Sequence, residues 1–209
     1  MQNEHGQTDI SDFNLERTVV LWASFLTGRN METDIPTKTQ WEFKLPTQET
    51  FLPFFKTFTS IDVPAYSHKK IHEEERRLLK AYFNDQATVQ EFDAIVWKIH
   101  EESKKEFFDS LGKFDLIMGY FNLADSIGHL SFGIQEKMKL IYQELDRMTE
   151  EAKSSEDFIL VISDHGMKPL GRYGDHTKNG FYSANKKLSL TLPKITDFYN
   201  LMRSLRNVA

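Results

Sequence analysis

Five side chains of this 209-residue chain carry metal-ligating groups and lie after apolar runs or in a glycine-rich loop. They are Asp125, His129, Asp164, His165 and His176. The first two follow the apolar run 115–121, and the next two follow the apolar run 158–162. Because ligands bind beyond the carboxyl ends of strands in open α/β sheets, both pairs are expected at one edge of a sheet. Carboxylate and imidazole donors without thiolates favour zinc or manganese.

A purely structural role is the alternative for each pair taken alone. Asp125 is suited to capping a helix, and Asp164 is suited to capping the turn after its strand. For one isolated Asp/His spacing, that reading is the commoner one. Two such pairs at successive strand ends, with His176 in the glycine-rich loop 171–176, favour the metal interpretation.

The other four histidines lack neighbours of ligand type. They are His5, His68, His72 and His100. His5 falls in a polar N-terminal stretch, and His72 and His100 fall on helices rich in charged residues. All four are expected to be solvated surface residues.

Apolar patterning predicts the elements that must position the ligands. Strands are expected over 58–63, 115–121 and 158–162, and helices over 20–27, 70–112, 134–152 and 195–206. The order strand, helix, strand implies a parallel βαβ unit, so the expected class is α/β with helices on both faces of a sheet. Residues 1–16 are polar and patternless and are expected to form a disordered or poorly ordered arm, leaving 17–209 as one domain.

Composition excludes several classes of function. The chain has no cysteine, which excludes disulfides, thiolate-bound metals, iron–sulfur clusters and a cysteine nucleophile. With 26 Lys+Arg against 31 Asp+Glu, the net charge of −5 argues against binding a nucleic acid duplex. No apolar run has the length of a membrane span, and the first residues do not have the pattern of a secretory signal. A cytoplasmic location is therefore expected.

Several segments resemble a known family. The segment Ile162–Met167, ISDHGM, resembles the Ser-Asp-His-Gly signature of the alkaline phosphatase superfamily, and the closer likeness is to the type I phosphodiesterase/nucleotide pyrophosphatase family. Asp125–His129 looks like that family's Asp-x-x-x-His metal element, and Gly174–Gly180 looks like its late Gly-x-His segment. Thr18–Gly28 is similar to the nucleophile segment, in which a threonine or serine stands nine residues before a Thr-Gly pair. The likeness covers most of residues 18–198.

The resemblance implies a fold, a cofactor and a reaction. The fold would be a three-layer α/β/α sandwich with a mostly parallel sheet. Two divalent ions, zinc or else manganese, would be bound, one by Asp125, His129 and His176, and the other by Asp164, His165 and the Thr18 hydroxyl. Thr18 would be the nucleophile in the hydrolysis of a small phosphorylated substrate, a nucleotide or other phosphodiester.

The sequence also departs from the family pattern. The family opens with an apolar strand that ends in a metal-binding aspartate, and the seventeen residues before Thr18 contain no such strand. The sheet is therefore expected to lack its first strand, as in an N-terminally short relative of prokaryotic type. Leu21 stands where the extracellular enzymes carry a phosphate-binding asparagine. Arg29 and Asn30 are the candidates for contacts with the substrate phosphate.

The departures leave two functions open. The first is the metal-dependent phosphodiesterase. The second is a catalytically incomplete scaffold that binds one metal ion or a protein partner, because the first aspartate ligand is absent. Among related enzymes, a cofactor-independent phosphoglycerate mutase fits less well because it uses serine, and Thr18 cannot serve as the modified residue of a sulfatase. The oligomeric state is left open.

Overall fold

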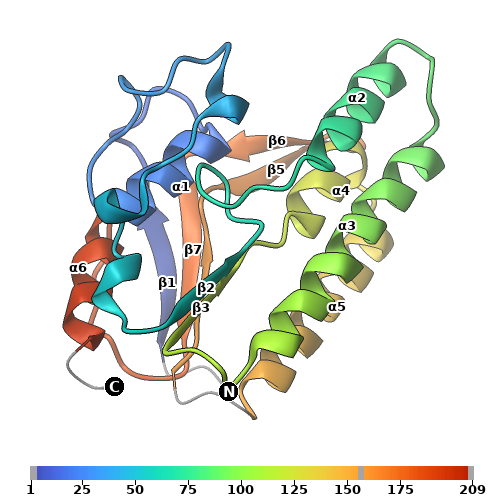
Figure 1. Cartoon of the computed structure of the whole chain (residues 1–209). Helices are drawn as coiled ribbons and strands as arrows, with labels where there is room; N and C mark the ends of the chain where they lie inside the picture. Colours follow the sequence, from blue (N-terminus) through green and yellow to red (C-terminus); the bar gives the residue numbers. More distant parts are fainter. Residues whose placement is uncertain (1–3, 155–157, 207–209) are drawn as a thin grey trace.

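The computed structural model describes residues 4–154 and 158–206, which form helices and short strands (Figure 1). The helices are α1 (Thr18–Thr27), α2 (His72–Phe83), α3 (Val89–Ser110), α4 (Leu123–Ser131), α5 (Gln135–Ala152) and α6 (Phe198–Leu205). The strands are β1 (Glu4–Asp9), β2 (Phe58–Ile61), β3 (Leu116–Gly119), β4 (Leu160–Ser163), β5 (Gly166–Leu170), β6 (Tyr173–Thr177) and β7 (Asn179–Ala184). Short 3-10 helices lie at Gln40–Glu42, Thr47–Glu49, Leu52–Phe54 and Ile195–Asp197.

The strands form three small sheets among the described residues. The strand order is β1-β7-β4 in an antiparallel sheet, β2-β3 in a parallel pair and β5-β6 in an antiparallel hairpin. The expected three-layer sandwich around a mostly parallel sheet is therefore wrong, although the α/β content is as predicted. The apolar pattern of residues 158–162 predicts a strand, but it does not specify the neighbour of that strand or its direction.

The strand-helix-strand prediction holds for one crossover and fails for the next. From β2 the chain passes through α2 and α3 and returns as β3, parallel to β2, with Phe58 opposite Leu116. After β3 it passes through α4 and α5 to β4, which pairs with β7 and not with β3. The cause is the segment after Ser163, which turns back as the β5-β6 hairpin and brings β7 antiparallel to β4.

The N-terminal segment is more ordered than its composition indicates. Residues 1–3 lie outside the described residues, but residues 4–9 form β1, so the expected arm is wrong there. The Glu4 carboxylate accepts hydrogen bonds from the backbone N–H groups of Leu188, Ser189 and Leu190. These bonds and the pairing with β7 fix a strand that its own side chains do not predict.

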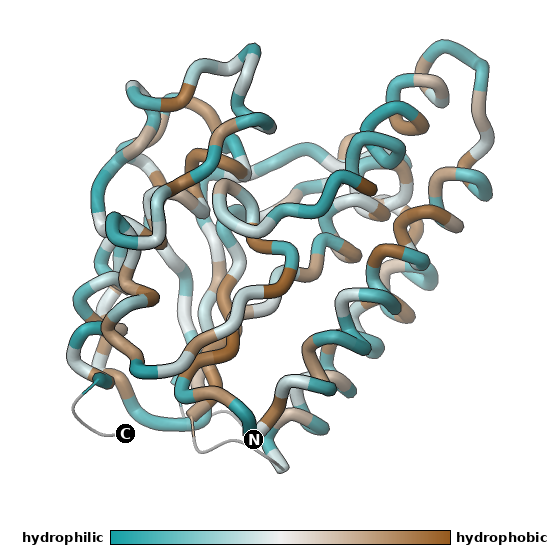
Figure 2. The backbone as a smooth tube through the Cα atoms, in the orientation of Figure 1, coloured by the Kyte–Doolittle hydropathy of each residue, from teal (hydrophilic) through white to brown (hydrophobic). Residues whose placement is uncertain are grey.

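Two hydrophobic clusters support these elements. The first surrounds α1, whose residues from Val19 to Leu26 are all buried, and it also receives Leu116 of β3 and Ile162 of β4. The second is formed by the facing sides of α3, α4 and α5. Helices α3 and α5 alternate between hydrophobic and hydrophilic segments (Figure 2), as expected for helices with one buried face. Among the described residues, we find no helix with the length and hydrophobicity needed to cross a membrane.

Candidate metal centre

Helix α4 presents two of the predicted ligands on one face. Asp125 and His129 are four residues apart, so their side chains lie on the same side of the helix. The opposite side carries Leu123, Ile127 and Leu130, which are fully buried in the second hydrophobic cluster. The burial of the apolar side therefore turns the aspartate and the histidine toward the strands.

The turn after β4 supplies the second pair. Asp164 and His165 are both buried. The Nδ1 atom of His165 lies 3.1 Å from the backbone carbonyl of Gly166, which fixes Nδ1 as the protonated nitrogen. The other ring nitrogen, Nε2, lies 3.6 Å from Oδ2 of Asp164. Because the carbonyl contact occupies Nδ1, Nε2 is the nitrogen through which His165 could bind a metal ion.

The glycine-rich sequence predicts a loop at His176, but in the structure this residue lies on strand β6. It pairs with Met167 across the β5-β6 hairpin. The hairpin packs closely on α4 because a Cβ atom at Gly128 would lie only 2.5 Å from Sδ of Met167. Glycine at position 128 therefore allows the hairpin to bring His176 against the ligand face of α4.

The three histidines converge on one carboxylate oxygen. From Oδ1 of Asp125, the Nε2 atoms lie at 3.2 Å for His176, 3.7 Å for His129 and 3.9 Å for His165. The rings of His165 and His176 are stacked, with their centroids 3.7 Å apart. The side chains of Asp125, His129 and His176 are 22 to 29% exposed, so solvent can reach the cluster.

The charges of the cluster depend on one another. Burial opposes the charge of Asp125, but hydrogen bonds from His129 and His176 hold its pKa well below the usual range. Burial also lowers the pKa of His176, yet the Asp125 carboxylate outweighs it, so the pKa of His176 is raised. At Asp164, burial and the nearby charge of Asp125 together raise the pKa. The cluster thus favours a positive charge near both carboxylates.

The donor set fits a divalent cation. Ligands at about 2.0 to 2.1 Å from a tetrahedral zinc ion lie about 3.4 Å apart, close to the separations between Asp125 and the three histidines. Oδ2 of Asp164 is buried and has no hydrogen-bond partner among the described residues, although a buried carboxylate normally has one. Asp125, His129 and His176 form a group that could hold a metal ion.

Thr18 is the first residue of α1 and is half-buried. The backbone of Glu16, two residues earlier, forms a hydrogen bond with the imidazole ring of His176. Lys178, two residues after His176, donates from Nζ to the backbone carbonyls of Phe13 and Asn14, at 3.1 and 3.3 Å. The segment that leads into Thr18 is therefore fastened to the strands that carry the metal ligands.

Arg29 and Asn30 are placed elsewhere. Both follow the far end of α1, about 16 Å along the helix axis from Thr18. Arg29 forms ion pairs with Asp34 and Glu49, and the side chain of Asn30 donates to the backbone carbonyl of Asp12, at 3.1 Å. These contacts are not with the candidate metal ligands, and the role of Arg29 and Asn30 in binding phosphate stays a prediction.

Three histidines interpreted as solvated are in fact buried. His72 and His100 are 2% and 1% exposed, and the His68 side chain is 9% exposed, so that interpretation is wrong for all three. His68 and His72 lie beside Asp62, and His100 lies beside Glu144. Asp62 directly follows strand β2, so the strand-end criterion that found the other aspartates would have found this one too.

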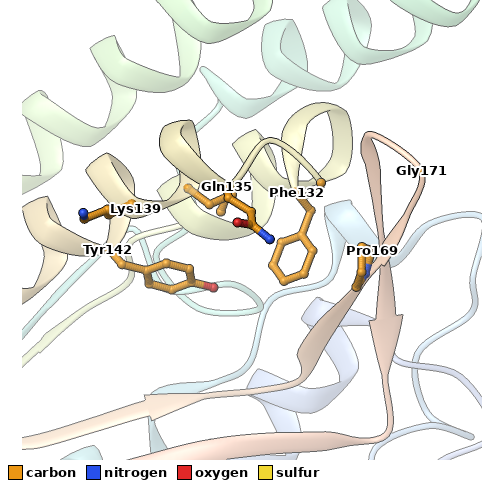
Figure 3. A pocket seen from close by; sticks show the side chains of 8 residues that line it. Phe132, Gln135, Lys139, Tyr142, Pro169 and Gly171 are labelled. Carbon is orange, nitrogen blue, oxygen red and sulfur yellow. The ribbon is translucent and has the colours of Figure 1, made fainter.

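A cavity of about 460 Å³ opens between α4, α5 and the hairpin (Figure 3). It is lined by Phe132, Gln135, Met138, Lys139, Tyr142 and Pro169. Phe132 follows His129 by one helical turn, so the cavity begins close to the metal ligands. The aromatic rings of Phe132 and Tyr142 face the same space in Figure 3, while the amino group of Lys139 points away from Pro169.

Comparisons with known proteins find no relatives. No family model, no curated protein and no solved structure matches this chain. The function must therefore be inferred from the side chains themselves.

Proposed function

We propose that this chain is a metal-dependent hydrolase of phosphate esters, acting on small phosphodiesters such as nucleotides, with Thr18 as its nucleophile. The spacing of the Nε2 atoms of His129 and His176 from one oxygen of Asp125 carries the proposal, because it is close to the ligand separations around a zinc ion. Asp125, His129 and His176 would hold one ion. Asp164, His165 and the Thr18 hydroxyl would hold a second, with zinc preferred and manganese as the alternative.

The bound ions would supply Lewis acidity, stabilising negative charge on the phosphoryl oxygens and making a nearby hydroxyl easier to deprotonate. Thr18 Oγ1 would then attack phosphorus, forming the Oγ1–P bond as the ester P–O bond breaks. The departing alcohol takes up a proton. Water afterwards cleaves the phosphothreonine and returns a proton to the hydroxyl, so that the enzyme is restored.

The start of α1 is well suited to the phosphate group. The first N–H groups of a helix are unpaired within it and carry a partial positive charge, which attracts anions. No side chain caps this end of α1, and its first turn holds no acidic residue. Of the first three residues of α1, only Thr18 is not fully buried, so its N–H group would be the one to meet a phosphate.

The cavity beside α4 supports a substrate with a planar organic group. Phe132 and Tyr142 offer aromatic faces, which stack favourably on nucleobases and aryl rings. Burial and the Asp125 charge both raise the pKa of Tyr142, so its hydroxyl remains protonated and within electrostatic range of the metal ligands. A phosphodiester held at the ligands would extend its organic group along α4 into this space.

Hydrolysis of bis-p-nitrophenyl phosphate with added zinc or manganese tests the proposal. We expect metal-dependent turnover that Thr18→Ala abolishes. Thr149→Ala is the matched control, because this α5 threonine is also partly buried and hydrogen-bonds only within its own helix. If metal binds tightly without any turnover, the incomplete scaffold is the correct function. If metal does not bind, the hydrolase and the metal-binding scaffold are both wrong, and only the scaffold that binds a protein partner is left.

A further inference from the structure

A second charged cluster is buried between β2, α2 and α4. Nε2 of His72 lies 2.8 Å from Oδ2 of Asp62, and Nδ1 lies 2.6 Å from Oε2 of Glu75. Because a carboxylate faces each ring nitrogen, both nitrogens must donate, so His72 is an imidazolium cation. Asp62, His72 and Glu75 are 2%, 2% and 8% exposed, so two carboxylates face one imidazolium away from water.

Glu75 connects this cluster to the helix that carries two metal ligands. Its Oε2 atom accepts a hydrogen bond from Nδ2 of Asn122, at 2.8 Å, and its Oε1 atom accepts one from the hydroxyl of Ser126. Asn122 also donates to Ser126 Oγ at 2.8 Å. Asn122 immediately precedes α4, and Ser126 follows Asp125. Glu75 therefore holds the first turn of α4 on both sides of Asp125.

The contact between Asn122 and Glu75 replaces the helix cap that the Asn122 side chain could otherwise form at the start of α4. Asparagine before the first residue of a helix commonly caps that helix with its side chain. Here Asn122 makes no such cap, since its amide group is directed to Glu75 and Ser126. The start of α4 is thus fixed by a charged group on α2.

Stability alone is a weak explanation for three buried charges. Apolar side chains of similar volume are often as stabilising as a buried ion pair, or more so, because charges lose their hydration. A satisfied buried network does, however, specify one arrangement of the elements that it joins. Here the elements joined are α2, β2 and the ligand helix α4.

We propose that Glu75 is a positioning residue for the metal ligand Asp125, acting through Asn122 and Ser126. The proposal rests on the metal site of the proposed function. Loss of the Glu75 charge leaves α4 free to shift or rotate by a fraction of a turn, and Asp125 and His129 move with it. Outer residues that orient ligands typically change metal affinity about 10- to 100-fold when they are replaced.

Cobalt titration followed by visible absorption tests this proposal without relying on catalysis. We expect Glu75→Gln to bind Co²⁺ about 10- to 100-fold more weakly than the wild type, with an altered d–d spectrum. Glu4→Gln is the matched control, because the Glu4 carboxylate also accepts several hydrogen bonds, from the backbone N–H groups of Leu188, Ser189 and Leu190 at the opposite end of the chain. The control variant should keep the wild-type affinity and spectrum. Circular dichroism confirms that each variant is folded.

The outcomes separate the two proposals. Wild-type affinity and spectrum in folded Glu75→Gln overturn the positioning role and leave the metal site intact. Failure of the wild type to bind Co²⁺ or Zn²⁺ overturns both proposals. If Glu75→Gln does not fold, Ser126→Ala decides, because it removes one hydroxyl beside Asp125. Several-fold weaker Co²⁺ binding supports the positioning role, and unchanged binding overturns it.

Discussion

Asp164 stands out at the scale of single residues because its position is unfavourable without a cation. The carboxylate is buried, one oxygen has no hydrogen-bond partner among the described residues, and burial raises its pKa. A buried carboxylate that lacks a hydrogen bond on one oxygen destabilises a fold, even with the His165 ring 3.6 Å away. Such a group is a common feature of binding sites, where a ligand supplies the missing partner.

Replacing Asp164 should therefore separate stability from metal binding. We expect Asp164→Asn to stabilise the metal-free protein by about 1 kcal/mol, because the neutral amide loses less hydration on burial. The same variant should lose most of the stabilisation that zinc gives to the wild type. Thermal unfolding in EDTA and in zinc measures both effects. A lower unfolding temperature for the variant in EDTA would contradict this explanation.

The sequence identified five candidate ligands that lie together in the structure, but it misjudged three of the other histidines. Asp125 and Asp164 were found because each follows an apolar strand. The burial of His72 could not be predicted from α2, because three consecutive glutamates follow His72 and give the helix a solvated pattern. It is buried by contacts from Asp62 and Asn122, which are 10 and 50 residues away in the chain.

At the scale of elements, the contact of α2 with β2 depends on the charge of His72. Burial opposes that charge, but Asp62 and Glu75 raise the pKa of His72 from 6.5 to about 9. Because the folded state holds the proton more tightly, this stabilisation is complete below pH 6.5 and is lost as the pH rises to about 9.

We expect the free energy of unfolding to fall by about 2 to 3 kcal/mol between pH 6.5 and 9.5 through this group. In His72→Gln, which cannot titrate, the fall should be smaller by that amount. Urea unfolding across this pH range measures the difference. Parallel pH profiles for the two proteins would show that His72 is not charged in the folded state.

The end of α1 depends on a glycine for two reasons. Gly28 has a φ of +70°, and a Cβ atom there would lie 2.7 Å from Cβ of Tyr199 on α6. Gly112, after α3, has a φ of +69° but has open space around the same position. Both glycines therefore have a left-handed backbone, which a residue with a Cβ atom adopts only with strain, but only Gly28 is closely packed.

Gly112→Ala should cost about 1 kcal/mol of unfolding free energy, from the left-handed backbone alone. Gly28→Ala should cost about 1 to 3 kcal/mol more, since α6 must also move away from α1. Chemical denaturation of both variants gives the comparison. Equal losses would show that α6 accommodates the added methyl group without cost.

The sequence predicted the elements that have strong local patterns, but apart from the β2-β3 crossover it did not predict which strands pair. The stripe of apolar residues predicted α5, and the apolar run 115–121 predicted β3. Strands β5, β6 and β7 lack a regular alternation of apolar residues and were missed. Strand β7 pairs with β1 and with β4, so contacts distant in the sequence define it, whereas β5 and β6 pair only with each other as a local hairpin.

At the scale of the whole molecule, the candidate metal centre joins two separately packed halves. Helix α4 belongs to the hydrophobic cluster with α3 and α5, whereas β4 packs against the cluster around α1. His176 comes from a hairpin that pairs with itself and packs on α4. An ion bound by Asp125, His129 and His176 would therefore hold the hairpin against α4.

Removal of metal should consequently loosen the hairpin first. We expect EDTA to speed amide hydrogen exchange in residues 166–177 at least 10-fold, while the middle of α3, buried through Phe92, Val96 and Ile99, changes little. Mass spectrometry of exchange with and without zinc measures this. Uniform acceleration across the chain would show instead that metal supports the fold as a whole.

The hydrogen bond between His176 and Asp125 spans 51 residues of the chain. An ion bound to both side chains would restrict the conformations of the unfolded chain as a covalent cross-link does. Closing a loop of that length corresponds to about 4 kcal/mol of chain entropy. A protein without cysteine has no disulfide to serve this purpose. Its cross-link would instead open and close with the supply of metal, independently of the redox state of its surroundings.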